Sequence, residues 1–357
     1  MVAPDAVRDG PNLSVIVPAR NEEAALGACL DSLLPQTGTS FEIIVVDDAS
    51  TDRTREIAQA LPVRLVNAPP LPDGWVGKNN AVAAGAREAR GLWLLFTDAD
   101  TVHLPGSLTR GLSDAQEHGA SLVSYSPAQE VHGILERAVM PVIFAELAAS
   151  YRPSDVNNPA SPAAAANGQY LLISREAYQS VGGHAAIARD LLEDVALARA
   201  VKRSGRKIYF RFGGDVVRTR MYRSFAQLRE GWTKNLVLLF ARPVRLAVMR
   251  LLEFLLIVGC VVVGVLLASK SRWQDAMLLA GVAAALLARF LNRVLRAHFP
   301  WDCNLFALLG LPLFAYLLLR SWFYHRKGVV TWKGRPYRPA ESGRELSPLS
   351  GSGSRQR

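Results

Sequence analysis

Cysteine is scarce in this chain. Its three residues, Cys29, Cys260 and Cys303, lie far apart, and two of them fall in apolar runs. A disulfide framework and a cysteine-based zinc site both need closely and regularly spaced cysteines, so the sequence excludes both. Charge is also limited, because only 20% of the 357 residues are charged and 50% are hydrophobic. That balance excludes a disordered chain. No apolar signal-peptide run stands at the N-terminus, so we expect a cytosolic catalytic part.

Apolar residues concentrate in the last third of the chain. The mean hydropathy is +0.13, which is high for a soluble enzyme. Three apolar runs follow one another, at 251–268, 276–288 and 305–319, and tryptophans stand near their ends, at Trp273, Trp301 and Trp322. Runs of this kind with interfacial aromatics indicate membrane helices, and a buried helical subdomain is the alternative. We therefore predict five parts: a flexible tail 1–11, a catalytic domain 12–240, membrane or interfacial helices 241–325, a basic tail 326–340 and a disordered end 341–357.

The net charge of +10 points to an anionic partner, which is a nucleic acid, an anionic lipid or a phosphate-bearing substrate. The arginine-rich stretch 199–223 has no interleaved aromatic residues of the kind that stack on bases. We therefore expect no nucleic-acid partner, although a basic nucleic-acid-binding membrane protein stays the non-enzymatic alternative.

Strand and helix patterns alternate through the first half. Apolar strands are expected at 13–17, 41–46, 63–66, 92–96 and 121–125, and helices at 21–34, 52–60, 77–90 and 108–118. This alternation predicts an α/β domain with a mainly parallel central sheet. In such sheets, ligands bind beyond the carboxyl ends of the strands.

Acidic residues follow two of these strands. Asp47 and Asp48 end the strand 41–46, and Asp98 and Asp100 follow the strand 92–96. Two carboxylates that flank one small residue hold a divalent cation together with substrate oxygens, and oxygen ligands favour Mg²⁺ or Mn²⁺. Capping of a turn is the alternative for Asp98 and Asp100, but their position after a buried strand argues for the metal.

Further charged residues stand at predicted helix starts. Glu22 opens the first helix, and Lys78 opens the helix 77–90, where a cation conflicts with the helix dipole unless it meets a phosphate. Glu193 and Asp194 open a later helix. For the acidic residues the alternative is compensation of the helix dipole, and for Lys78 it is a solvated side chain.

Six sequence blocks occur in a familiar order. They are P-A-R-N-E-E from Pro18, V-V-D-D-A-S-T-D from Val45, T-D-A-D from Thr97, N-G at Asn167, E-D at Glu193 and a Q-x-x-R-W-like block from Gln227. Over roughly residues 12–340 the chain resembles the membrane-anchored inverting glycosyltransferases of family 2. Residues 74–78 and 220–222 are most similar to bacterial transferases of carotenoid or hopanoid lipids, and residues 330–337 to ceramide glucosyltransferases.

The resemblance implies a GT-A fold and assigns roles by position. It implies that the nucleotide-sugar is bound by Pro18, Arg20, Glu22, Asp47, Asp48, Lys78 and Asp98. It implies that Asp98 and Asp100 bind the metal, and that Asp194 is the catalytic base with Glu193 beside it. It implies that the acceptor or the diphosphate is contacted by Gly168, Arg229, Trp232, Lys333 and Arg335. The chain departs from the family pattern where Glu230 and Gly231 separate Arg229 from Trp232.

These roles predict a metal-dependent inverting transfer of a sugar from a nucleotide-diphospho-sugar, with a UDP-sugar expected, to a hydroxyl or carboxyl group of a membrane lipid. A metal with Lys or Arg neutralises the leaving diphosphate, and a carboxylate base activates the acceptor. The alternatives are a processive polysaccharide synthase, a polyprenyl-phosphate glycosyltransferase, which needs no base, and an inactive scaffold. We expect a multi-pass protein of the inner cell membrane with a cytoplasmic catalytic domain.

Topology is constrained by the basic segment 320–338, because basic segments that flank membrane spans prefer the cytosol. A cytosolic catalytic domain and a cytosolic tail need an even number of crossings. The run 276–288 makes a helix of only about 20 Å, so we expect one run to be re-entrant or interfacial and the segment 332–337 to return to the cytosolic face. We expect the segment 134–149 to lie against the membrane, with burial in the soluble domain as the alternative.

Overall fold

The computed structural model describes residues 10–332 and 335–337. The predicted disordered end 341–357, most of the predicted N-terminal tail and Lys333 lie outside the described residues. The chain divides into two compact units. The first comprises the described residues up to Gly133, Glu146–Arg223 and His298–Pro300, and the second comprises Ile134–Ala145, Ser224–Ala297 and the described residues from Trp301 onward.

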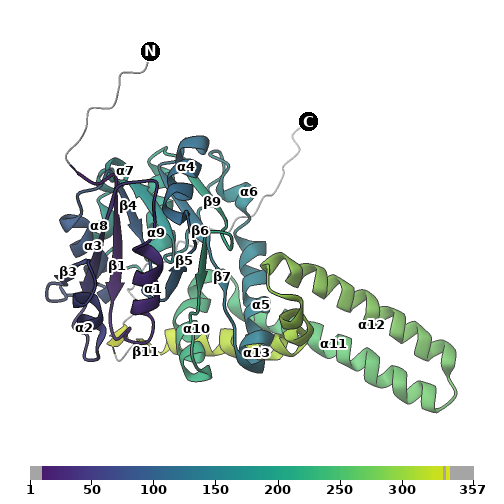
Figure 1. Cartoon of the computed structure of the whole chain (residues 1–357). Helices are drawn as coiled ribbons and strands as arrows, with labels where there is room; N and C mark the ends of the chain where they lie inside the picture. Colours follow the sequence, from purple (N-terminus) through teal and green to yellow (C-terminus); the bar gives the residue numbers. More distant parts are fainter. Residues whose placement is uncertain (1–9, 333–334, 338–357) are drawn as a thin grey trace. The chain divides into compact units, whose positions relative to one another are not determined.

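A seven-stranded sheet forms the centre of the first unit (Figure 1). Its strands, in sheet order, are β3 (Arg64–Asn67), β2 (Phe41–Asp47), β1 (Leu13–Ala19), β4 (Trp93–Phe96), β8 (Leu171–Ser174), β6 (Leu122–Ser126) and β9 (Ile208–Phe212). Strand β8 runs antiparallel to β4 and β6, and the other neighbouring pairs are parallel. The predicted mainly parallel sheet is therefore confirmed.

Helices cover both faces of this sheet because alternate side chains of a strand point to opposite faces. In β1, Leu13, Val15 and Val17 pack in one buried cluster and Ile16 packs in another. The first cluster includes residues of α1 (Leu26–Leu33), α2 (Thr54–Gln59) and α4 (Ser107–His118). The second includes residues of α3 (Gly77–Glu88), α6 (Pro153–Val156), α7 (Arg175–Ser180) and α9 (Glu193–Arg203), and α8 (Gly183–Ala186) directly precedes its Ile187.

A small second sheet was missed by the sequence patterns. Its order is β5 (Thr101–His103), β10 (Val217–Thr219) and β7 (Ala128–Gln129). Strand β5 pairs with β10 in antiparallel register, so Thr101 lies opposite Thr219. Three-residue strands leave too short an apolar pattern to recognise, and this pairing joins residues more than 100 positions apart. It anchors the chain directly after Asp100.

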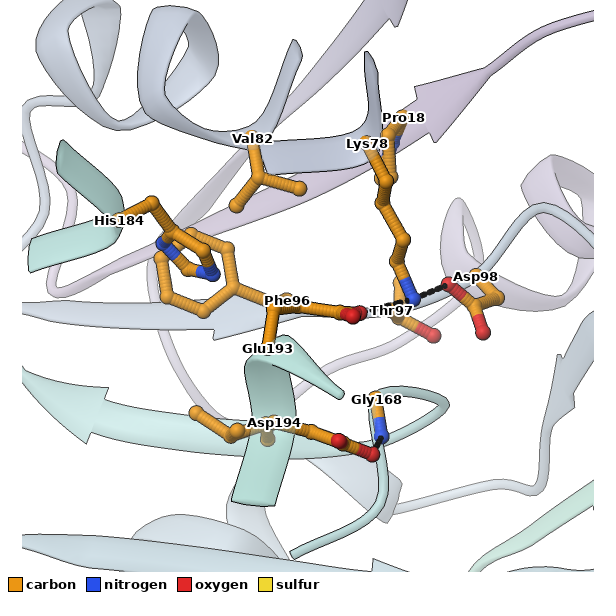
Figure 2. Close-up of a pocket in the computed structure, with 11 residues that line it drawn as sticks. Pro18, Lys78, Val82, Phe96, Thr97, Asp98, Gly168, His184, Glu193 and Asp194 are labelled. Atoms are coloured by element: carbon orange, nitrogen blue, oxygen red, sulfur yellow. Dashed lines mark hydrogen bonds and ion pairs between the residues drawn. The ribbon is translucent and has the colours of Figure 1, made fainter. Parts of the chain in front are cut away.

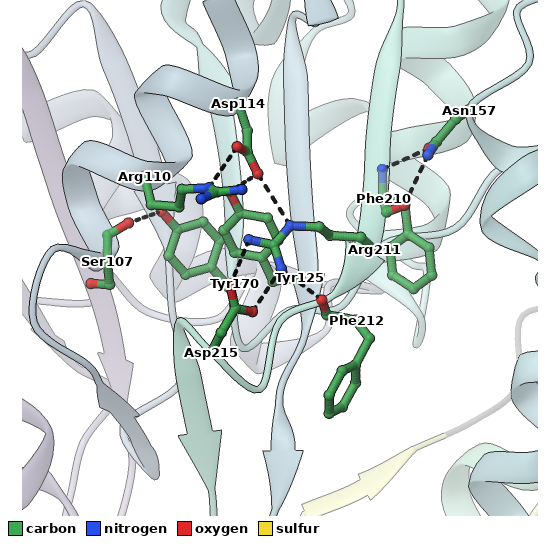
Figure 3. A network of polar contacts seen from close by, with 10 residues as sticks. All are labelled: Ser107, Arg110, Asp114, Tyr125, Asn157, Tyr170, Phe210, Arg211, Phe212 and Asp215. Carbon is green, nitrogen blue, oxygen red and sulfur yellow. Dashed lines mark hydrogen bonds and ion pairs between the residues drawn. The ribbon is translucent and has the colours of Figure 1, made fainter. Parts of the chain in front are cut away.

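A buried ionic network ties α4 to β6 and β9 (Figure 3). Asp114, which is 1% exposed, accepts hydrogen bonds from Tyr125 Oη at 2.6 Å, Arg110 Nε at 2.8 Å and Arg211 Nε at 3.2 Å. Arg211 also pairs with Asp215 at 2.7 Å and lies over the Tyr125 ring. Removing one partner of such a buried set typically costs about 3–5 kcal/mol, so the network holds one edge of the sheet rigidly.

The second unit is helical. It contains part of α5 (Gly133–Ser150), then α10 (Phe225–Leu239), α11 (Pro243–Ser269), α12 (Trp273–Val294), the 3₁₀ turn η1 (Leu295–Ala297), α13 (Trp301–Arg326) and the strands β11 (Val330–Trp332) and β12 (Arg335–Tyr337). The three predicted apolar helices are present as α11, α12 and α13, and each is long and apolar enough to cross a membrane. Helix α12 extends past the run 276–288 at both ends, to 22 residues or about 33 Å.

Helices α11 and α12 form an antiparallel hairpin (Figure 1). Near its open end, Glu253 Oε2 pairs with Arg293 Nη2 at 2.6 Å and with Arg250 Nη1 at 3.0 Å. Only 11% of the most apolar window of α11 and 17% of that of α12 are buried, whereas the value for α13 is 50%. The hairpin therefore presents apolar side chains outward on nearly all sides, and α13 does so on one face only.

The segment 134–149, which forms most of α5, was expected to lie against the membrane, and α13 contains the third apolar run. In α5, Ile134 and Leu135 are exposed, whereas Val139 and Ile143 are fully buried. The middle of the segment is therefore buried, but residues 134–145 belong to the second unit, so burial in the soluble domain is not what the structure shows for them. The exposed large apolar residues of α13 recur at helical spacing: Trp301, Leu305, Leu309, Tyr316, Leu319 and Phe323.

Candidate active site

The carboxyl ends of three parallel strands meet at one edge of the large sheet. Strand β1 pairs with β2, which sets Ala19 opposite Asp47, and β1 pairs on its other side with β4, which sets Ile16 opposite Phe96. The loops that follow β1, β2 and β4 carry the predicted acidic residues. The strand register therefore brings together, at one edge of the sheet, predicted site residues that are up to 80 positions apart in the sequence.

The loops after β1 and β2 are joined by hydrogen bonds. Asn21 and Ala49 both adopt positive φ, at 53° and 55°, which turns each chain sharply out of its strand. Asn21 N donates to Ser50 Oγ at 3.1 Å, and Thr51 N donates to Asn21 Oδ1 at 2.9 Å. This reciprocal pair explains why helix α1 begins at Leu26, later than the sequence pattern predicts.

The predicted nucleotide contacts lie on these joined loops. Arg20 Nη1 donates to the Asp48 carbonyl at 2.6 Å and lies 4.0 Å from its carboxylate. Asp47 is 6% exposed; its Oδ1 accepts from Ser50 N at 3.2 Å, and its Oδ2 lies 3.7 Å from Arg55 Nη1. Both carboxylates are thus held in place. Their contact with a nucleotide stays a prediction.

Lys78 connects two acidic groups that are distant in the sequence (Figure 2). Its Nζ lies 2.7 Å from Asp98 Oδ1 and 2.6 Å from Glu193 Oε1. Burial alone would lower the pKa of Lys78, but the charges of Asp98 and Glu193 outweigh burial and raise the pKa well above its usual value. The ammonium therefore stays charged and fixes the strand-end carboxylate against the start of α9. Lys78 is therefore ion-paired, with its side chain 32% exposed, and its contact with a phosphate stays a prediction.

Asp194 follows Glu193 in the sequence and lies next to Gly168 in the same pocket. Its Oδ2 accepts from Gly168 N at 2.9 Å, and its Oδ1 accepts from Val195 N at 2.7 Å. Burial, followed by the charge of Glu193, raises the pKa of Asp194 to about 7, although Lys78 and the two backbone donors act in the opposite direction. A carboxylate with such a pKa is suited to accept a proton near neutral pH.

Apolar residues form the wall of the same pocket (Figure 2). Pro18, Val82, Phe96 and Leu171 line it beside the charged groups, together with His184. Burial lowers the pKa of His184 to about 4, so its ring is neutral. Sequence reasoning named only Pro18 among these five, because the others are ordinary core residues until the fold turns them toward the carboxylates. The glycine pair before His184 was the one local signal of a sharp turn.

Of the two predicted metal ligands, Asp98 contacts Lys78, and Asp100 follows it two residues later. Burial raises the pKa of the Cys29 thiol, and the charges of Asp100, Asp98 and Glu22 raise it further. The place of Glu22 in the site stays a prediction. Among the residues that the structure describes, no three or more His, Cys, Asp or Glu side chains are arranged to hold a metal ion by themselves.

A buried histidine supports the loop that carries Asp98 and Asp100. His103, which is 3% exposed, contacts Thr97 Oγ1 at 3.0 Å and Ser107 Oγ at 3.1 Å through its two ring nitrogens. Burial lowers the pKa of His103 to about 3, so the ring is neutral. Thr97 also donates to the Gln169 carbonyl at 2.8 Å, which joins the loop to the segment that carries Gly168. No motif signalled this histidine.

The remaining predicted site residues belong to the second unit. Arg229 is exposed on α10, and Trp232 is 3% exposed, with its Nε1 donating to Met140 Sδ at 3.4 Å. Arg335 lies on β12, and Lys333 is outside the described residues. The roles of all four stay predictions.

Comparisons with known proteins identify the domain that bears this site. Residues 14–182 match the family described as "Glycosyl transferase family 2". The chain carries a glycosyl transferase family 2 domain. The predictions of this family and of a glycosyltransferase are thereby confirmed.

Relatives and a solved structure agree with this domain. The 4,4'-diaponeurosporenoate glycosyltransferase of Staphylococcus aureus (strain USA300) is 28% identical over 340 residues, which cover 91% of this chain and 88% of that protein. The protein of that name from strain MRSA252 is 29% identical over the same shares. A mannosyltransferase from Pyrobaculum calidifontis, solved with GDP-Man and Mn²⁺, matches with a TM-score of 0.54 at 21% identity, covering 90% of this chain and 89% of that one. The predicted GT-A fold of the glycosyltransferase is confirmed.

Proposed function

We propose that this glycosyltransferase transfers a sugar, with inversion, from a nucleotide-diphospho-sugar to a hydroxyl or carboxyl group of a carotenoid-like membrane lipid. The observation that carries the proposal is the Lys78 bridge, which holds Asp98, from the strand ends, and Glu193, beside Asp194, in one pocket. Donor-side and acceptor-side groups thus lie within reach of one sugar. A UDP-sugar is the proposed donor.

Asp194 is the proposed base. Direct displacement needs the acceptor to attack the face of the sugar opposite the diphosphate, and a hydroxyl needs to lose a proton as it attacks. Asp194 lines the same pocket as Lys78 and Asp98, and its raised pKa suits this proton transfer. Both carboxylate oxygens are oriented by backbone N–H groups. No covalent sugar intermediate is needed.

Asp98 and Asp100 are the proposed ligands of Mg²⁺ or Mn²⁺, since two hard carboxylates at one strand end fit such an ion and donor oxygens can complete its shell. The ion would neutralise the leaving diphosphate. Lys78 would add a fixed positive charge near the same group, because its contacts with Asp98 and Glu193 hold it at the donor side of the pocket.

The lipid acceptor is supported by two independent features. The relatives named as diaponeurosporenoate glycosyltransferases cover nearly the whole chain, membrane helices included. The hairpin of α11 and α12 exposes apolar residues along almost its full length. A protein with such a surface stays in a bilayer, where an apolar acceptor is concentrated.

We propose that α11 and α12 cross the inner membrane as a pair, with the catalytic domain cytoplasmic, and that α13 lies in the interface. The mostly exposed hairpin and the half-buried α13 support an even number of crossings. Single cysteines in a cysteine-free background, treated with a membrane-impermeant reagent on intact cells, test this. Labelling at Ser271 without labelling at Gly334 is expected, and labelling at Gly334 would refute it.

The activity test uses the full chain in lipid nanodiscs with a panel of nucleotide-sugars. Nucleotide release that depends on an added carotenoid alcohol or carotenoid acid, together with a glycosylated lipid found by mass spectrometry, is expected. Release that depends only on a polyprenyl phosphate, or a polymeric product, would favour the alternative enzymes. Failure to release nucleotide from any donor with any of these acceptors would refute the proposal.

A further inference from the structure

We infer that Arg220 binds the diphosphate of the donor and stabilises it as it leaves. This inference rests on the proposed function and adds a residue to it. Arg220 directly follows β10, whose Thr219 lies opposite Thr101 of β5. Thr219 Oγ1 donates to the Asp100 carbonyl at 3.2 Å. Continued by one residue, the antiparallel register sets Arg220 opposite Asp100, and directly opposed residues share one face of a strand pair.

The Nε of the Arg220 guanidinium is shielded from solvent and makes no hydrogen bond among the described residues. Arg211 shows the contrast, because its guanidinium is paired with both Asp114 and Asp215. A shielded donor without a hydrogen-bond partner destabilises the folded protein, and a charged acceptor offsets that cost.

The surroundings of Arg220 select a diphosphate over the base or the sugar. Asp100 is a proposed metal ligand, and in such sites carboxylates bind the metal together with oxygens of the substrate phosphates. The planar guanidinium fork matches two oxygens of a phosphate, and negative charge grows on those oxygens as the sugar bond breaks.

Arg218 provides a matched control on the same strand. It lies two residues before Arg220, opposite Val102 and Ala128, and it is exposed. Neither neighbour in its register is acidic. Arg218 lies on β10 and Arg220 directly follows it, so losing an arginine at position 218 tests the effect of removing a positive charge from the same segment away from Asp100.

The test measures calorimetric binding of UDP and of UMP, with GDP and GMP as a second pair, to the full chain in nanodiscs with Mn²⁺. R220Q should weaken diphosphate binding about 10- to 100-fold, as expected for a lost charge-assisted hydrogen bond, and should change monophosphate binding less than threefold. R220K should retain part of the preference, and R218Q should match the wild type. Monophosphate binding by each variant shows that its site is folded.

The possible outcomes separate the two claims. If the wild type prefers a diphosphate and both R220Q and R220K keep the full preference, the role of Arg220 is refuted and the proposed function stands. An equal loss in R218Q and R220Q also refutes it, because the effect would then be structural. If the wild type binds none of the four nucleotides, the proposed donor is wrong and the role of Arg220 falls with it.

Discussion

Replacing Gly168 with alanine tests whether the Lys78 bridge is needed for transfer. An ideal Cβ at Gly168 would lie 2.9 Å from Lys78 Nζ, 3.3 Å from Glu193 Oε1 and 3.8 Å from Asp194 Oδ2. The backbone of Gly168 is not among those with positive φ, so alanine fits its conformation. The substitution therefore acts through the added methyl group alone. It forces the flexible end of Lys78 to move by about half an ångström or more.

The effect of that displacement on activity can be estimated from the contacts that Lys78 would lose. Lys78 Nζ cannot move away from the methyl group and keep contacts of 2.6 Å and 2.7 Å with both carboxylates. A charge-assisted hydrogen bond is worth about 1.5–3 kcal/mol, which corresponds to roughly 10- to 150-fold in kcat/KM. Stability should change little, because a flexible side chain gives way instead of the backbone.

The matched control is Gly27→Ala on α1. The nearest atom to an ideal Cβ there is Ile57 Cγ2 at 3.9 Å, an ordinary contact. Alanine in a helix is favoured over glycine by up to about 1 kcal/mol, so this variant should keep full activity and unfold slightly higher. Nucleotide release with the lipid acceptor and thermal unfolding are measured for both variants. The reasoning is refuted if Gly168→Ala retains activity within threefold of the wild type at unchanged stability.

Three further predictions concern the carboxylates. Asp194→Asn should lower the rate of transfer to a hydroxyl acceptor about 10²- to 10⁴-fold and leave nucleotide binding within a few fold. The rate of transfer to an already ionised carboxyl acceptor should fall much less. Equal losses of binding and rate would make Asp194 a binding residue. Asp100→Asn should abolish most of the Mn²⁺-stimulated rate without lowering the unfolding temperature, and wild-type activity that survives excess EDTA would contradict the proposed metal. Because burial and Glu193 raise the pKa of Asp194 to about 7 and only the ionised form accepts a proton, kcat/KM for a hydroxyl acceptor should fall as the pH drops below 7; an acid limb near pH 4 would refute this assignment.

Much of the first unit was predictable because its signals are local. Apolar runs marked β1, β2 and β4, and the acidic residues that end β2 and follow β4 were visible in sequence order. Parallel strands place their carboxyl ends at one edge, so the gathering of Asp47 and Asp98 followed from the strand pattern alone. Long apolar runs likewise marked α11, α12 and α13, since a membrane-length helix needs no partner to be recognised.

Contacts that depend on exact distances were not predictable. The bridge from Lys78 to Asp98 and Glu193 joins residues 20 and 115 positions apart in numbering, and only packing of α3 and α9 on the sheet brings them within 3 Å. The neutral His103 beneath the acidic loop had no motif, because burial and not residue type sets its pKa. The strands β5 and β10 were too short to recognise.

The sequence by itself thus determined the α/β class, the acidic edge of the sheet and the apolar C-terminal helices, because periodicity and strand-end residues act locally. The tertiary structure alone decided which charges meet. Gly168 was a motif position until the fold placed it against Lys78, Glu193 and Asp194. Arg220 was one arginine of a basic stretch until the register of β10, continued by one residue, set it opposite Asp100. Electrostatic energy depends on separations of a few ångströms, and such separations exist only once distant segments are packed together.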